Sequence, residues 1–286
     1  MEVSLEPMAA PAEGLEAFDL TVNALSERPV RGYLVKPKDA KPGTLPAMLF
    51  YHGAGWNDSN IDNPTRAAKA GFLALDINAH GVENQQPASY YKELKNNELK
   101  DYMYAGREDR ETYYFLGMYL RALRAVDFLT SQPEWDGEVL TLWGSSQGGA
   151  QALAVTGLDD RVTAVAANVP AMCDLSGCAD PRRAGWPRPV PVDENGICGD
   201  AQVLETARYF DTVNFARHIT ADALFIVGLA DTTCPPAGVF AAYNQVQGEK
   251  QIEVRPEMGH ELPWEVIQRM DGFLKEKAKS QGAKKE

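Results

Sequence analysis

Apolar and polar residues follow the chain in short blocks that are typical of strands alternating with helices. Residues 18–23 and 31–36 alternate between apolar and polar side chains around a turn-like stretch at 26–29, which predicts an antiparallel pair of strands. The runs at 46–51 and 72–77 are largely apolar throughout, as expected of strands buried on both faces. Further strands are predicted at 138–143, 162–167, 223–228 and 251–255.

Helical periodicity is clearest at residues 110–130, where apolar side chains at 116, 120, 123 and 126 recur at helical spacing. Other helices are predicted near 63–70 and at 263–277. An opening antiparallel pair followed by alternating strands and helices implies an α/β fold, with a mainly parallel central sheet covered by helices on both faces. No break in composition divides the chain. We therefore expect one domain over 1–286, with irregular insertions near 81–108 and 171–199 and a frayed tail at 278–286.

Charge and hydropathy limit the kinds of partner that the protein is expected to bind. The net charge of −12 argues against nucleic acid or an anionic membrane as a main partner, since both reward basic patches. No run approaches the roughly 18 apolar residues of a membrane span. The first six residues lack the basic start and apolar core of a signal peptide, so none is visible. A cytoplasmic and an exported location both stay open.

The four cysteines form no C-x-x-C pair, which disfavours a zinc ribbon, and they are too few and too irregularly spaced for a disulfide scaffold. Cys173, Cys178 and Cys198 fall in one irregular segment. The sequence leaves open whether one disulfide forms among them or all remain thiols. It predicts no metal site.

One serine is distinguished by its neighbours. Residues 144–148 read Gly-Ser-Ser-Gln-Gly and separate the predicted strand at 138–143 from a helix-compatible stretch. A serine between a strand and a helix, with glycine two positions to each side, is the nucleophile-elbow pattern. The turn is so tight that flanking side chains would collide, which favours glycine. Ser146, and not Ser145, has glycine at both positions. Since Gly/Ser runs also form ordinary turns, partners elsewhere must support the assignment.

A serine hydroxyl needs a base to take its proton, and the usual base is a histidine oriented by a carboxylate. Asp231 follows the predicted strand at 223–228, and His260 follows the one at 251–255. Serine, acid and histidine in this chain order, each behind a strand, are typical of α/β-hydrolases. Parallel strands deliver such loops to one edge of the sheet. Asp231 could alternatively, or in addition, cap a helix that begins near Pro235.

The other three histidines fit the role of base less well. His218 precedes a strand and is expected on the opposite side of the sheet. His52 and His80 follow early strands and could approach the site, but neither fits the expected chain order.

Hydrolysis also needs N–H donors aimed at the developing oxyanion. The backbone N–H of Gln147, directly after the nucleophile, is one candidate. The other is the N–H of Ala54, in a His-Gly loop at 51–56 that resembles the corresponding lipase loop. The alternative is that this stretch is merely a glycine-rich turn.

Several blocks resemble the acetyl xylan esterase / cephalosporin C deacetylase family, carbohydrate esterase family seven. The most specific are Tyr-Phe-Asp-Thr-Val-Asn-Phe-Ala at 209–216 and Cys-Pro-Pro-Ala-Gly-Val-Phe-Ala-Ala-Tyr-Asn at 234–244, beside the elbow and the pair at 260–261. The likeness extends over roughly 30–275. It implies an α/β-hydrolase fold without cofactor or metal. It also implies the nucleophile Ser146, the acid Asp231, the base His260 and the oxyanion donors Gln147 and Ala54.

Two positions depart from the family pattern. Residues 78–82 read Asn-Ala-His-Gly-Val and keep only the glycine of the family's Arg-Gly-Gln motif. The donor position in the His-Gly loop is usually tyrosine, whereas this chain has Ala54. A backbone donor tolerates that change, but the pocket loses an aromatic ring. The resemblance therefore carries the chemistry over more securely than the substrate.

The leading hypothesis is a serine esterase that removes acetyl groups from carbohydrate esters, such as acetylated xylo-oligosaccharides, through an acyl-enzyme. Alternatives are a broader carboxylesterase, a peptidase or a dienelactone-type hydrolase, or a carbohydrate-binding protein without catalysis. The tyrosines between 81 and 119 either line a sugar platform or pack in the core. Trp186 could reach the site or a neighbouring subunit. Relatives are often oligomeric, and a homo-oligomer stays open.

Overall fold

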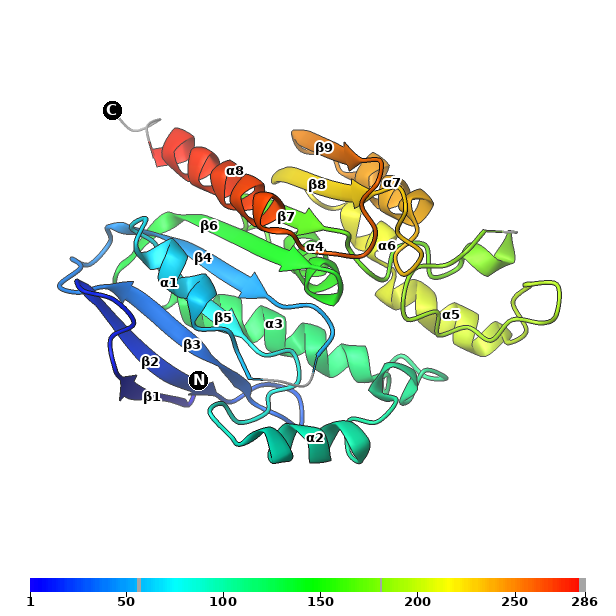
Figure 1. Cartoon of the computed structure of the whole chain (residues 1–286), viewed down its shortest axis with the longest axis horizontal. Helices are drawn as coiled ribbons and strands as arrows, with labels where there is room; N and C mark the ends of the chain where they lie inside the picture. The colour runs from blue at the N-terminus through cyan, green and yellow to red at the C-terminus, as the bar shows by residue number, and fades with distance from the viewer. Residues whose placement is uncertain (56–57, 181, 283–286) are drawn as a thin grey trace.

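A computed structural model describes residues 1–55, 58–180 and 182–282 of the chain. Within these residues the strands form one sheet of nine, in the order β1-β2-β3-β5-β4-β6-β7-β8-β9 (Figure 1). Their bounds are β1 Val3–Met8, β2 Leu15–Val22, β3 Val30–Pro37, β4 Leu45–Tyr51, β5 Leu73–Ile77, β6 Trp135–Ser145, β7 Ala164–Asn168, β8 Asp222–Gly228 and β9 Lys250–Arg255.

Pairing within the sheet changes from antiparallel to parallel along its width. The strands β1, β2, β3 and β5 pair antiparallel in that order. From β5 onward every neighbouring pair is parallel. The predicted antiparallel opening and mainly parallel sheet are therefore confirmed. The loops after β4, β6, β7 and β8 consequently leave the sheet at one edge, where α/β proteins place their ligand sites.

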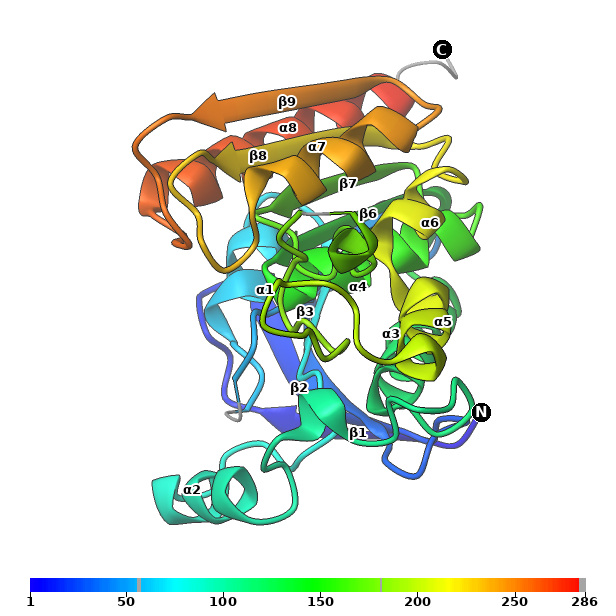
Figure 2. The same ribbon diagram turned by 90° about the vertical axis from the view of Figure 1, so that its right-hand side faces the viewer.

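Helices cover both faces of the sheet (Figures 1 and 2). On one face α1 and α8 enclose a core that includes Met48, Phe50 and Trp143. On the other, α3, α4 and α7 enclose a second core around Leu49, Leu142 and Phe225. The helices are α1 Asp62–Ala68, α2 Ala88–Asn96, α3 Tyr114–Thr130, α4 Gln147–Leu158, α5 Ala201–Phe210, α6 Thr212–Ala216, α7 Pro236–Gln245 and α8 Trp264–Gly282, with short 3-10 turns at Tyr102–Tyr104 and Gly177–Ala179.

Several elements differ from their predicted extent. The strand β1 was not expected, because its side chains are exposed and its place rests on backbone pairing with β2. The helix α2 lies within the predicted irregular insertion near 81–108. Hydrogen-bonded turns at 106–113 delay the start of α3 to Tyr114. The helix α8 continues to Gly282, past the predicted end at 277, and 283–286 fall outside the described residues.

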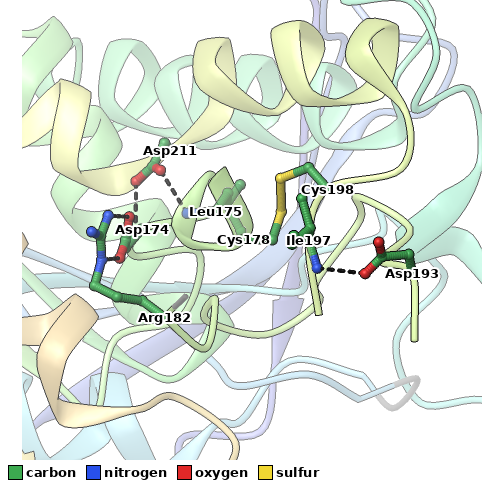
Figure 3. Close-up of a disulfide and its surroundings, with 8 residues drawn as sticks. All are labelled: Asp174, Leu175, Cys178, Arg182, Asp193, Ile197, Cys198 and Asp211. Atoms are coloured by element: carbon green, nitrogen blue, oxygen red, sulfur yellow. Dashed lines mark hydrogen bonds and ion pairs between the residues drawn. A yellow bond between two sulfur atoms is a disulfide. The ribbon is translucent and has the colours of Figure 1, made fainter. Parts of the chain in front are cut away.

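The 171–199 segment crosses the edge of the sheet where the parallel strands end, and it is largely irregular (Figure 2). A disulfide between Cys178 and Cys198 closes a loop within it (Figure 3). Cys173 and Cys234 are free and buried. The carboxylate of Asp211 accepts hydrogen bonds from the backbone N–H groups of Asp174 and Leu175, which ties this segment to the start of α6.

Among the helices of the described residues, none combines the length and apolar character needed to cross a membrane.

Candidate active site

Ser146 occupies a strained turn between β6 and α4. Its φ of 55° and ψ of −119° lie outside the regions that non-glycine residues favour, a conformation that costs about 1–3 kcal/mol. A side chain at Gly144 would collide with the backbone of Gly148, and one at Gly148 would collide with the carbonyl group of Tyr51. These contacts explain why both flanking positions are glycine. The Ser146 N–H donates to the carbonyl oxygen of Asn168 at 2.9 Å and so fixes the turn against β7.

A chain of hydrogen bonds leads from this serine to a buried carboxylate. The Oγ atom of Ser146 lies 2.7 Å from Nε2 of His260. The other ring nitrogen, Nδ1, lies 2.7 Å from Oδ2 of Asp231. The Asp231 side chain is fully buried, whereas a quarter of the His260 side chain (25%) is exposed. With the ring proton on Nδ1, His260 donates to Asp231 and Nε2 accepts from the serine hydroxyl.

The loop after β8 holds Asp231 in place. Its second oxygen, Oδ1, accepts from the backbone N–H groups of Thr233 at 2.8 Å and Cys234 at 2.9 Å. The helix α7 begins after Pro235 and has no side-chain cap, so the alternative role of Asp231 as its N-cap is wrong. Asp231 instead caps its own turn, and this arrangement aims Oδ2 at the imidazole.

The rings of His52 and His80 have other partners. Nε2 of His52 accepts from the N–H of Ala79, and burial lowers the pKa of this ring. Nδ1 of His80 lies 2.8 Å from the hydroxyl of Tyr114, and burial lowers the pKa of His80 to about 3. Both rings are therefore neutral near pH 7. Within the described residues, His260 is the histidine hydrogen-bonded to Ser146.

The expected oxyanion donors lie close to the serine. Gln147 opens α4, and its fully buried side chain accepts from the Tyr102 hydroxyl at 2.5 Å, so the side chain is engaged in the core. The N–H groups of a helix's first turn have no partner within the helix and carry partial positive charge. Ala54 shares the wall of one cavity with Ser146. These positions suit the oxyanion role, which stays a prediction for both residues.

The cavity in front of Ser146 has a volume of about 370 Å³, near the lower end of the range for ligand pockets. Trp186 contributes to its wall, so the prediction that this residue reaches the site is confirmed. The Trp186 N–H donates to the carbonyl oxygen of Thr233, which anchors the 171–199 segment against the Asp231 loop. Tyr102, Tyr113 and Tyr119 are buried, as expected of packing residues. Trp56, from the predicted His-Gly loop, lies outside the described residues.

Two residues next to the site belong to blocks that match the family but were given no site role from the sequence. Asn168 is fully buried, and its Nδ2 donates to Oγ of Ser145 at 2.9 Å and to the carbonyl oxygen of Glu261 at 3.0 Å. It therefore joins the turn that carries Ser146 to the loop that carries His260. Cys234 is buried beside Asp231, and burial raises the pKa of its thiol to about 12. The position of Asn168 at the end of β7 was the signal that could have revealed it.

Ligand atoms of Asp231, Cys234 and His260 lie within 4.8 Å of one another, a spacing that could hold a metal ion. Asp231 and His260 already bond to each other and Cys234 is a neutral thiol, so a metal would have to displace a proton and break that bond. The arrangement as it stands is suited to proton transfer between serine and imidazole.

The sequence is similar to proteins described as acetyl xylan esterase or acetyl esterase. A family model described as acetyl xylan esterase (AXE1) matches residues 1–276. The acetyl esterase Axe7A of Xylanibacter ruminicola is 35% identical over 249 residues, which are 84% of this chain and 55% of the relative. The chain thus spans about half the length of that curated relative.

Solved structures give the same grouping. An acetyl xylan esterase from a Paenibacillus species superposes with a TM-score of 0.81 at 28% identity, covering 96% of this chain and 88% of that one. Acetyl xylan esterase 1 from a Thermoanaerobacterium species superposes with a TM-score of 0.79 at 27% identity, with the same coverage of 96% and 88%. The chain therefore has the α/β-hydrolase fold and belongs to the acetyl xylan esterase family.

Proposed function

We propose that this chain is a serine esterase that removes acetyl groups from carbohydrate esters, such as acetylated xylo-oligosaccharides. The observation that carries the proposal is the unbroken hydrogen-bond chain from Ser146 through His260 to Asp231, at the mouth of a cavity and in a member of this family. The catalytic roles of these residues, and of the Gln147 and Ala54 N–H groups, are part of the proposal.

In the first half of the reaction, Oγ of Ser146 attacks the ester carbonyl while Nε2 of His260 takes the hydroxyl proton. The carbonyl oxygen becomes an oxyanion that the N–H groups of Gln147 and Ala54 stabilise. Collapse of this intermediate breaks the bond to the sugar oxygen, which leaves with the proton from His260. Asp231 stabilises the imidazolium and remains ionised throughout.

In the second half, water loses a proton to His260 and attacks the acetyl carbon of the acyl-enzyme. The second oxyanion collapses, acetate leaves, and the proton returns to Oγ of Ser146. Two backbone N–H groups hold Oδ1 of Asp231, so the carboxylate stays oriented with Oδ2 towards the imidazole. Oδ2 in turn keeps a proton on Nδ1 of His260, which leaves Nε2 free to exchange protons in both halves.

The test compares two adjacent serines. Ser146→Ala is expected to lower kcat for p-nitrophenyl acetate by at least about 10⁴-fold, as loss of the nucleophile does in serine hydrolases. Ser145→Ala is the matched control, because it removes the neighbouring hydroxyl and should retain activity within about tenfold. Circular dichroism would show that both variants are folded. An active Ser146→Ala enzyme would refute the assignment.

The substrate is tested separately. Acetate release from acetylated xylan should exceed release from other acetylated sugars, and acetyl esters should react faster than butyryl or octanoyl esters. Faster turnover of aminoacyl amides or of long acyl esters would contradict deacetylation and favour a peptidase or a broader carboxylesterase. A folded protein that bound xylo-oligosaccharides without hydrolysing any ester would point to a carbohydrate-binding role.

A further inference from the structure

A second cavity of about 530 Å³ lies within the 171–199 segment, outside the site described above. Leu175, Val190 and Val192 give it apolar walls, and the disulfide partner Cys178 also lines it (Figure 3). Three arginines, Arg182, Arg183 and Arg188, line the same space, and among the described residues no aspartate or glutamate lines it. This concentration of positive charge contrasts with the net charge of −12 of the whole chain.

The three arginines are not equally neutralised. Arg182 pairs with the carboxylates of Asp174 at 2.9 Å and Asp180 at 2.8 Å, so its charge is balanced. Arg188 bonds only to carbonyl oxygens, those of Ala184, Thr232 and Thr233. In the part of the chain that the structure describes, Arg183 is exposed and has no hydrogen bond or ion pair. Among the described residues, neither Arg183 nor Arg188 forms an ion pair with a carboxylate, although the charge of Asp231 acts on Arg188 from a distance.

Arg188 combines a strained backbone conformation with a like charge nearby. Its φ of 55° is left-handed, a backbone conformation that costs a non-glycine residue about 1–3 kcal/mol. Burial and then the charge of Arg183 lower the pKa of Arg188, so the two like charges are close enough to interact. Three hydrogen bonds from its side chain keep it there nonetheless. An anion in the cavity would relieve the repulsion between the two arginines.

Residues that are near each other in the sequence line this cavity and the one in front of Ser146. Trp186 lines the cavity in front of Ser146, and Arg188, two residues later, lines the second cavity. Arg188 also donates to the carbonyl oxygen of Thr233, which lies on the wall of the catalytic cavity. A saccharide bound at Ser146 would have to extend past Trp186 to reach Arg188.

We infer that Arg183 and Arg188 form a subsite for the carboxylate of a uronic acid carried by the acetylated saccharide whose ester reacts at Ser146. The inference rests on the proposed function for the identity of the saccharide. The planar guanidinium of Arg183 can bind a carboxylate through paired, charge-assisted hydrogen bonds. Arg188 can add donors from Nη1, because its Nε and Nη2 atoms already donate to carbonyl oxygens. The apolar walls beside them suit the carbon face of a sugar ring, and the volume accommodates a ring with its substituent.

Binding is tested first, without catalysis. The enzyme is titrated calorimetrically with D-glucuronate, D-glucose and inorganic phosphate. D-glucuronate should bind at least about tenfold more tightly than D-glucose. This ratio corresponds to about 1.4 kcal/mol of binding free energy, which charge-assisted hydrogen bonds can supply. Its affinity should fall as NaCl rises from 0.1 M to 1 M, since the screening length shrinks from about 10 Å to about 3 Å. Equal affinity for the acid and the neutral sugar would overturn the subsite. Phosphate binding as tight as D-glucuronate would overturn its assignment to a sugar acid.

Variants of two arginines test where D-glucuronate binds. Arg183→Gln should weaken D-glucuronate binding about tenfold, and Arg183→Lys should weaken it less, because the charge remains while the planar fork is lost. Arg217→Gln is the matched control, since Arg217 is exposed, contacts Asn214 and precedes β8 at the opposite end of the strand. Unchanged binding by Arg183→Gln, or equal weakening by Arg217→Gln, would refute the location.

Kinetics separate this inference from the proposed function. Arg183→Gln should leave p-nitrophenyl acetate hydrolysis unchanged and raise KM about tenfold for an acetylated xylo-oligosaccharide that carries a uronic acid. KM for the neutral oligosaccharide should not change. Deacetylation of both oligosaccharides with equal KM would overturn the subsite alone. Glucuronate binding through Arg183 without deacetylation of any saccharide would overturn the proposed function and leave an acid-sugar site.

Discussion

Replacing Asn168 by alanine is expected to slow catalysis without touching a reacting atom. The side chain donates to Oγ of Ser145 and to the carbonyl oxygen of Glu261, the residues that flank Ser146 and His260. Asn168→Ala removes both hydrogen bonds and leaves the carbonyl oxygen of Glu261 without the Asn168 donor. The histidine loop can then shift relative to the nucleophile turn.

The magnitude follows from those contacts. Two hydrogen bonds contribute about 0.5–1.5 kcal/mol each, so the free energy of unfolding should fall by about 1–3 kcal/mol. A displacement of about 1 Å between catalytic groups can cost about 100-fold in rate. We therefore expect kcat to fall about 10- to 100-fold. KM should change less, because Asn168 does not line the catalytic cavity.

The assay combines kinetics with urea unfolding. Activity towards p-nitrophenyl acetate is measured at a temperature where unfolding curves show every variant to be native. Asn84→Ala is the matched control, because Asn84 is buried and bonds to Asp19, Gly32 and Ser59, none of which contacts Ser146 or His260 through a hydrogen bond in the described part of the chain. It should lose stability and keep kcat.

Two results would refute this reasoning. If Asn168→Ala lost stability but kept kcat within about twofold, the residue would be structural only. If Asn84→Ala lost as much kcat as Asn168→Ala, the loss would reflect general destabilisation rather than the spacing of the two loops.

Three further changes test other parts of the structure. Burial raises the pKa of Asp76 from 3.8 to about 7, so the stabilising contribution of this group is complete below pH 4 and is lost as pH rises through 7. Between pH 5 and 8, the free energy of unfolding in urea should therefore fall by about 2–3 kcal/mol more for the wild type than for Asp76→Asn. Parallel pH profiles of the two proteins would contradict this. The double variant Cys178→Ala/Cys198→Ala should lose about 2–4 kcal/mol of stability because the unfolded loop is no longer closed, and an unchanged unfolding midpoint would show the bond to be dispensable. Gly148→Ala should reduce kcat at least about 100-fold because the new methyl group meets the Tyr51 carbonyl, and near-normal activity would contradict the tight turn.

The sequence was informative where one residue type at one position is required. Glycine at 144 and 148 is demanded by backbone contacts, which is why the pentapeptide pointed to Ser146 and not to Ser145. Asp231 and His260 follow strands of a parallel sheet, so chain order alone placed them at one edge. The regular alternation of residues 18–23 and 31–36 likewise predicted β2 and β3.

Features that depend on contacts between distant segments were beyond prediction. The strand β1 has exposed side chains and therefore no burial pattern to reveal it. The pairing of Cys178 with Cys198 rather than Cys173 follows from the path of the irregular segment, which no periodicity describes. Asn168 looks like an ordinary strand end until its amide is seen between Ser145 and Glu261.

The loop closed by the disulfide has a consequence for how this enzyme could diversify. Ser146, Asp231 and His260 all belong to turns at the ends of sheet strands, whereas Trp186, Arg183 and Arg188 all lie between the two bonded cysteines. The residues proposed to catalyse the reaction and those proposed to bind the substrate thus lie on separate stretches of chain. Residues 178–198 could be replaced by another segment that begins and ends with cysteine. We expect such a replacement to change the alcohol part of the ester that binds, while Ser146, Asp231 and His260 keep their positions on the sheet. This loop is therefore a suitable segment for engineering substrate selectivity.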